Sequence, residues 1–172
     1  MAFYTADPLK LSGNAIDRIA NEWMLVAAGD KQRYNMMTAS WGFFGEMWGK
    51  HVAGIVLRPQ RFTKQFVDQK SHFSLSFFGT DERARALHKI CGSQSGRDID
   101  KAAATGLTPV CDVVRDTVYF AEAPLVLICR KLYAAPFDPA AFADQALRDA
   151  VYPDGDWHTQ YFGEIVEVLE QG

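Results

Sequence analysis

The sequence predicts a mainly β fold in which an antiparallel barrel carries helical insertions. Short apolar or alternating runs follow one another at the spacing of hairpins. Regular helical patterns do not separate them, as they would in a doubly wound parallel sheet. The 172 residues are most economically one domain, spanning the whole chain, and are enough to bury a full core.

The first three expected strands lie close together in the sequence. Residues 24–29 form a short apolar run that ends in a turn, and the turn leads into a second strand at 34–37. Residues 51–57 are rich in β-branched and apolar side chains and predict a third strand. Pro59 ends this strand because proline restricts the residue before it and has no backbone N–H.

Two helices and a strand are expected next. Thr63 is a suitable N-cap for a helix over 63–70, because its hydroxyl can accept from a free backbone N–H. Residues 72–78 alternate apolar and polar side chains, which is the pattern of a half-buried strand. Thr80 is expected to cap a second helix, and Gly92 to end it.

The second half of the chain continues the mainly β pattern. Residues 93–100 are polar and predict a loop, followed by strands at 118–121 and 125–133. A helix is expected at 140–150 and a last strand at 161–169. This gives roughly seven strands and three or four helices.

Composition argues against several classes of function. The net charge is −3 and the basic residues are dispersed, so nucleic-acid binding is not expected. The beginning of the chain does not resemble a signal peptide, and no apolar run is long enough to span a membrane, so we expect a cytoplasmic protein. Three cysteines without C-x-x-C spacing, and histidines without H-E-x-x-H, predict no disulfide framework and no metal site. The chain also lacks G-x-S-x-G, so no catalytic side chain is expected from this pattern.

The most informative segment spans residues 34–48 and reads YNMMTASWGFFGEMW. Its backbone N–H groups, together with the hydroxyls of Thr38 and Ser40, can hydrogen-bond the polar edge of a flat ring, and Trp41 or a methionine can cover the face of that ring. A flavin has such an edge and face. The alternative is an ordinary strand end in which Trp41 is a core aromatic.

Two further segments are able to hold an anion. Arg58 and Arg61 precede the free N–H groups of the expected helix at Thr63, which is a suitable setting for phosphate. Residues 93–101, with serines, a glycine and two cations, can form an anion-binding concavity. The alternatives are a capped helix with solvated arginines and a solvated surface loop.

His158 follows a tryptophan and could line a pocket for nicotinamide or substrate, although a lone histidine is more often a packed or surface residue.

The segments described above, in this order, resemble the flavin reductase-like family of FMN-binding split barrels, over residues 23–168. The branch with the longer SGRD-x-DK loop, which includes flavoredoxin-like proteins, is the most similar.

The resemblance implies a Greek-key split β-barrel with helical insertions, a homodimer, and FMN near the subunit interface. It implies residues around the isoalloxazine and ribityl: Asn35, Thr38, Ala39, Ser40 and Trp41. It implies residues at the phosphate: Arg58, Arg61 and Thr63. It implies residues that close over the phosphate or ring edge: Ser93, Ser95, Gly96, Arg97 and Lys101. His158 matches a late histidine near the nicotinamide, although Asp156-Trp157 replaces the commoner Gly-Asp before it.

The activity implied by the resemblance is hydride transfer from NAD(P)H to a bound flavin, which then passes electrons to an acceptor that the sequence does not identify. One alternative is an FMN-holding electron carrier that is reduced by a protein donor and does not turn over nicotinamide. Another is a split barrel that binds heme or a different ligand, which the aromatic content and the histidines would allow.

Overall fold

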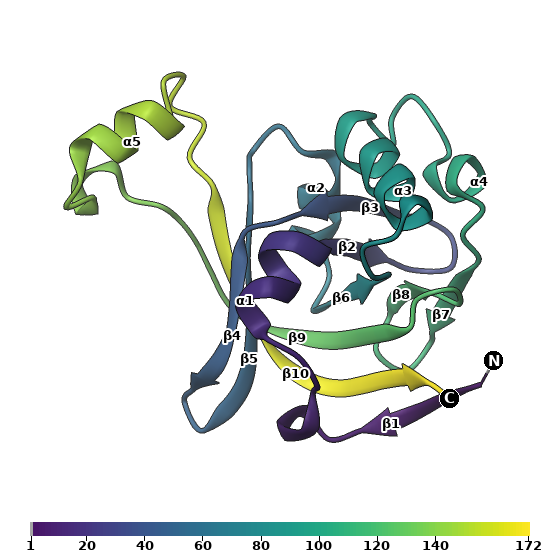
Figure 1. Cartoon of the computed structure of the whole chain (residues 1–172). Helices are drawn as coiled ribbons and strands as arrows, with labels where there is room; N and C mark the ends of the chain where they lie inside the picture. Colours follow the sequence, from purple (N-terminus) through teal and green to yellow (C-terminus); the bar gives the residue numbers. More distant parts are fainter. Residues whose placement is uncertain (1) are drawn as a thin grey trace.

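The computed structural model describes residues 2–172 and contains ten strands in this range (Figure 1). The strands are β1 Phe3–Ala6, β2 Met24–Gly29, β3 Tyr34–Ala39, β4 Gly42–Met47, β5 Lys50–Leu57, β6 His72–Phe77, β7 Pro109–Asp112, β8 Thr117–Phe120, β9 Leu125–Pro136 and β10 Thr159–Gln171. The α-helices are α1 Ala15–Asp17, α2 Phe62–Gln69, α3 Glu82–Ser93, α4 Lys101–Thr105 and α5 Gln145–Val151. Short turns of other helix types are η1 Pro8–Lys10, η2 Arg18–Glu22 and η3 Pro139–Ala141.

Eight of these strands form one antiparallel sheet, with the order β3-β2-β6-β9-β10-β5-β4 and with β1 added along β10. The register of β10 against β9 shifts between Phe162 and Gly163 and again between Ile165 and Glu167. Such bulges bend a strand and increase its twist, which lets the sheet curl. The mainly β class and the antiparallel arrangement predicted from sequence are therefore confirmed.

The central strands are buried on both faces. One face encloses the main core, to which Val26, Phe73 and Leu127 contribute. The other face of β2 and β6 is covered by α3, α4 and the β7–β8 hairpin. The strand predicted at 72–78 forms as β6, but the expectation that it is half-buried is wrong. Ser74 and Ser76 are also buried, and Ser74 Oγ donates to the Val118 carbonyl at 2.6 Å.

Three helix boundaries differ from those expected. Helix α2 has Arg61 as its N-cap, and Thr63 lies inside its first turn with its hydroxyl in a tertiary contact. Helix α3 is capped by Asp81, whose carboxylate accepts from the backbone N–H of Ala84 at 2.8 Å, and Thr80 does not cap it. Gly92 lies within α3, which continues to Ser93.

Four elements were not anticipated in their observed form. Strands β1, β4 and β7 were not predicted, and β4 includes part of the Trp-Gly-rich segment as an exposed edge strand. The helix expected at 140–150 is shorter, because Asp144 caps α5 after the separate turn η3.

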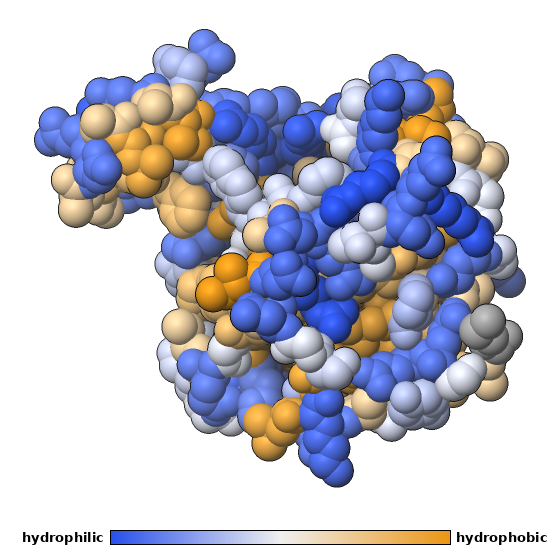
Figure 2. Space-filling view, in the orientation of Figure 1, coloured by the Kyte–Doolittle hydropathy of each residue, from blue (hydrophilic) through white to orange (hydrophobic). Residues whose placement is uncertain are grey.

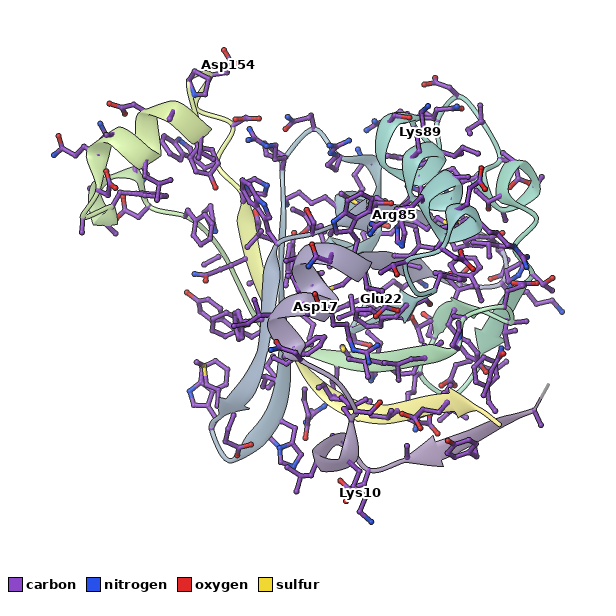
Figure 3. All side chains as sticks on the ribbon, viewed as in Figure 1. Lys10, Asp17, Glu22, Arg85, Lys89 and Asp154 are labelled. Carbon is purple, nitrogen blue, oxygen red and sulfur yellow. The ribbon has the colours of Figure 1, made fainter. Side chains whose placement is uncertain are left out.

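Residues 137–158, here called the arm, connect β9 to β10 and project away from the barrel (Figure 1). Asp154 lies at the tip (Figure 3). At the base, the Phe137 N–H donates to the His158 carbonyl at 2.9 Å. The arm is thus anchored to the sheet at both of its ends.

Within residues 2–172, no helix is long and apolar enough to cross a membrane. No group of three or more histidine, cysteine or acidic side chains in the same range is arranged to hold a metal ion. The three cysteines are free thiols.

Candidate functional site

Two adjoining cavities lie between β3, α2, α3 and the base of the arm. The first, here called the basic cavity, has a volume of about 160 Å³. It is lined by Asn35, Met37, Gln60, Arg61, Phe62, Thr63, Cys91, Ser93, Gln94, Ser95, Gly96, Arg97 and Lys101.

The second, here called the Trp41 cavity, has a volume of about 200 Å³. It is lined by Met37, Thr38, Ala39, Ser40, Trp41, Val56, Arg58, Arg61 and His158. Met37 and Arg61 line both cavities, so the two spaces adjoin. Every candidate residue derived from the sequence therefore lies on the wall of one cavity or the other.

A buried hydrogen bond shapes the floor of the basic cavity. Asn35 Nδ2 donates to Thr63 Oγ1 at 2.8 Å, which joins β3 to α2. Because Thr63 Oγ1 accepts this bond, its own hydrogen is available to a ligand. Gly96 packs against the same amide, so closely that a Cβ there would lie 1.9 Å from Asn35 Oδ1. Loop 94–100 can approach β3 only because this position has no side chain.

Lys101 supplies a buried positive charge to the same cavity. Its side chain is nearly enclosed, with only 5% of the residue exposed, and Nζ donates to the carbonyls of Met36 at 2.9 Å and Cys91 at 2.8 Å. Burial lowers the pKa of Lys101, and the nearby Arg61 lowers it further. Two of its three N–H groups are used by the fold, so Lys101 both ties β3 to α3 and makes the cavity positive.

Two guanidinium groups complete the basic cavity. Arg61 Nη1 donates to the Gly92 carbonyl at 3.1 Å, and its other N–H groups have no hydrogen-bond partner among residues 2–172. The Arg97 guanidinium lies over the Phe62 ring, 4.4 Å from its centroid. None of the lining residues is acidic, so the cavity is suited to an anion.

The Trp41 cavity has a different character. Ser40 and Trp41 lie between β3 and β4, outside both strands. Trp41 is half exposed, and its ring lies 5.1 Å from the His158 ring with an angle of 41° between the planes. Thr38 Oγ1 donates to the His88 carbonyl at 2.9 Å, so this hydroxyl is already engaged inside the protein.

Arg58 lies in the Trp41 cavity and does not line the basic cavity, where its neighbour Arg61 is found. Its Nη1 forms an ion pair with Asp156, and its Nη2 donates to the Val151 carbonyl at 3.0 Å. The amide of Gln60 donates to Asp156 and, with Arg58, lowers the pKa of that carboxyl. Arg58 therefore anchors the arm, and its charge is largely balanced.

His158 stands at the junction of the arm and the Trp41 cavity. Its Nδ1 lies 2.8 Å from the hydroxyl oxygen of Tyr152. Burial lowers the pKa of His158 to about 4, and the positive charges of Arg58 and Arg61 act in the same direction. The imidazole is therefore neutral at physiological pH.

Several lining residues are not among the cofactor-binding candidates predicted from the sequence. Met37, Val56 and Phe62 supply apolar wall, and Gln60 and Gln94 supply amide groups. The position of Met37 could have been inferred from the two-residue repeat of a strand, because Met37 lies two positions after Asn35 and therefore on the same side of β3. Tyr152 and Asp156 had no such signal, because their contacts depend on where the arm folds.

The chain belongs to the flavin reductase like domain family, whose model matches residues 16–172. The chain therefore has a flavin reductase-like, flavin-binding fold. A comparison with curated proteins found no match.

Solved structures with the same fold include flavoredoxin of Desulfovibrio vulgaris (Miyazaki F), with a TM-score of 0.67 and 23% identity over 88% of this chain and 70% of that one. An FMN-binding protein from Thermus thermophilus, with bound p-hydroxybenzaldehyde, has a TM-score of 0.65 and 23% identity over 88% of this chain and 72% of that one. The NADH:FAD oxidoreductase of Streptomyces globisporus C-1027 has a TM-score of 0.63 and 14% identity over 88% and 76%. The fold is therefore that of the FMN-binding split barrels.

Proposed function

We propose that the chain binds FMN, with the phosphate in the basic cavity and the isoalloxazine in the Trp41 cavity, and transfers hydride from NAD(P)H to it. One observation carries the proposal. The residues that the family resemblance assigns to FMN come from β3 and the two residues after it, from the start of α2 and the loop before it, and from the segment between the end of α3 and the start of α4. They line two spaces that adjoin at Met37 and Arg61. A ligand with a flat ring at one end and a phosphate at the other requires such a pair of spaces.

The donors of the basic cavity fit a phosphate. Arg61 and Arg97 offer free N–H groups, Thr63 offers its hydroxyl hydrogen, and buried Lys101 adds positive charge. The free N–H groups at the start of α2 add the positive end of a helix dipole. With no acidic side chain on the wall, a dianion meets only attractive charge there.

The Trp41 cavity fits a flavin ring for a separate reason. The backbone groups of Ser40 and Trp41, which link β3 to β4, can hydrogen-bond a polar ring edge, while Met37 and Val56 provide an apolar wall. The bound flavin supplies the electron-accepting centre, so no nucleophilic side chain is required. The protein orients the ring, and Trp41 and neutral His158 limit the access of water to it.

A second candidate function is an FMN-holding electron carrier that does not use NAD(P)H. The charge balance of the Trp41 cavity favours it, because Arg58 is paired with Asp156 and is not free to bind the phosphates of a nicotinamide nucleotide. The similarity in fold to a flavoredoxin is consistent with this candidate. In this case the electron donor would be a protein.

We propose that the chain acts as a homodimer in the cytoplasm. Trp41, Phe43 and Trp48 are exposed large aromatic side chains, and apolar side chains also gather on the arm (Figure 2). A concavity of about 380 Å³ between the arm and the barrel is lined mostly by apolar residues. Extensive exposed apolar surface is typical of an interface, and sedimentation velocity would measure the oligomeric state.

Absorption spectroscopy and NAD(P)H oxidation test the proposed function together. We expect flavin absorption bands after reconstitution with FMN, and bleaching of these bands under anaerobic conditions when NADH or NADPH is added. A flavin-loaded protein that only a protein donor can reduce would select the carrier. A protein that binds no flavin at any accessible concentration would refute both candidates, and a Soret band would indicate heme.

A further inference from the structure

Within the described residues, the hydroxyl of Tyr152 is the only side-chain group that hydrogen-bonds the His158 side chain. Both residues lie at the base of the arm. The distance from Tyr152 Oη to His158 Nδ1 is 2.8 Å. Both residues are buried, with exposed fractions of 6% and 7%. His158 also lines the Trp41 cavity.

The position of the Tyr152 ring is fixed from several sides. The Trp157 ring packs on it with a centroid distance of 4.7 Å, and Phe142 packs edge-on at 5.9 Å. The Arg58 guanidinium lies over the same ring at 5.3 Å, held there by Asp156 and by the Val151 carbonyl. The tyrosine hydroxyl is therefore held in place toward His158.

The direction of the hydrogen bond follows from counting donors and acceptors. If Nδ1–H donated to Tyr152, the buried hydroxyl hydrogen would have no acceptor among the described residues. If the hydroxyl donates to Nδ1, its hydrogen and the Nδ1 lone pair are both satisfied. A buried polar group without a partner is unfavourable, so the second arrangement is preferred. It leaves the single N–H of the neutral imidazole on Nε2.

Nε2 of His158 has no hydrogen-bond partner among the described residues. Unlike Nε2 of His88, which is buried and unpaired, it is not fully buried. His158 lines the Trp41 cavity, so this nitrogen is open to a ligand there. The charged groups that face the histidine are Arg58, Asp156 and Arg61.

We propose that Tyr152 is a positioning residue that fixes His158 as the Nε2–H tautomer, so that His158 donates a hydrogen bond into the Trp41 cavity. The ligand atom at this position is then an acceptor, such as a carbonyl oxygen of the flavin pyrimidine edge or of a nicotinamide carboxamide. The kinetic part of this inference rests on the proposed function. The tautomer itself does not depend on it.

Long-range ¹H–¹⁵N NMR of the full chain at neutral pH tests the tautomer directly. A His158→Gln variant assigns the signals. We expect an unprotonated Nδ1 and a protonated Nε2 in the wild-type protein, and loss of this preference in Tyr152→Phe. Tyr133→Phe, on the neighbouring strand β9 and without a contact to His158, is the matched control. A protonated Nδ1 in the wild type, or an unchanged tautomer in Tyr152→Phe, would overturn the proposal.

Kinetics then test the consequence for the reaction. With FMN and NADH, we expect Tyr152→Phe to lower turnover by roughly two- to tenfold, the effect of one neutral hydrogen bond. The pH dependence of turnover should also change, which a purely structural loss would not produce. If Tyr152→Phe shifts the tautomer of His158 but leaves turnover and its pH dependence as in the wild type, the positioning role of Tyr152 is overturned. Absence of nicotinamide turnover in the wild type would refute the proposed hydride transfer and leave the tautomer result standing.

Discussion

Gly96 offers the sharpest test of how the basic cavity is built. A Cβ at this position would lie 1.9 Å from Oδ1 and 2.8 Å from Cγ of Asn35. The Asn35 amide must therefore move in a Gly96→Ala variant, and its hydrogen bond to Thr63 at 2.8 Å must break or distort.

The expected magnitude follows from that single buried bond. A neutral hydrogen bond contributes about 1 kcal/mol, and a buried polar group left without a partner costs about 1–3 kcal/mol. We therefore expect Gly96→Ala to lower the free energy of unfolding by about 1–3 kcal/mol. FMN affinity should fall about tenfold, equivalent to about 1.4 kcal/mol, because Thr63 loses the partner that orients its hydroxyl.

Urea unfolding and fluorescence titration with FMN measure the two effects. Gly45→Ala is the matched control, since no atom lies within 4 Å of a Cβ built there, and its stability should change by no more than about 0.5 kcal/mol. In an Asn35→Ala background the obstructing amide is absent, so adding Gly96→Ala should have a smaller effect. The reasoning is refuted if Gly96→Ala behaves like Gly45→Ala, or if the two substitutions are additive.

Three further predictions concern ionisable groups in and near the site. Arg61→Ala should weaken FMN binding by about 1.5–3 kcal/mol, the contribution of a charge-assisted hydrogen bond; unchanged affinity in a fluorescence titration would place the phosphate elsewhere. The pKa values of His88 and His158 are each lowered from 6.5 to about 4, so the unfolded chain binds more protons between these values. The contribution of each histidine to the free energy of unfolding should therefore be complete above pH 6.5 and should fall by roughly 1–3 kcal/mol as the pH drops toward 4. Urea unfolding at several pH values should show a flatter profile for the histidine-to-glutamine variants. Asp156→Asn should loosen the arm, seen as faster hydrogen exchange in residues 137–158, whereas wild-type exchange would contradict the anchoring by the ion pair.

The fold was largely predictable because its strands carry local signals. The apolar run at 24–29 and the alternation at 72–78 were found from residue patterns alone. The edge strand β4 was missed because glycines and exposed aromatics resemble a turn until a neighbouring strand pairs with them. The second buried face of β6 was missed because the β7–β8 hairpin that covers it lies far along the chain.

The candidate residues named from the sequence line two adjoining cavities, but the contacts that they make were not predictable. Thr63 is a residue type that often caps helices, yet its hydroxyl accepts a hydrogen bond from Asn35, which lies 28 positions earlier in the sequence. Arg58 is a residue type that often binds anions, yet it forms an ion pair with Asp156, which lies 98 positions later in the sequence. Such partners are set by sheet topology and by the path of the arm, and no local pattern encodes them.

A crystal structure of the chain with FMN tests the central claim most directly. The account predicts phosphate density in the basic cavity, within hydrogen-bond reach of Arg61 and Thr63, and ring density beside Ser40 and Trp41. Density for the flavin at any other place on the molecule, or none at saturating FMN, would contradict it.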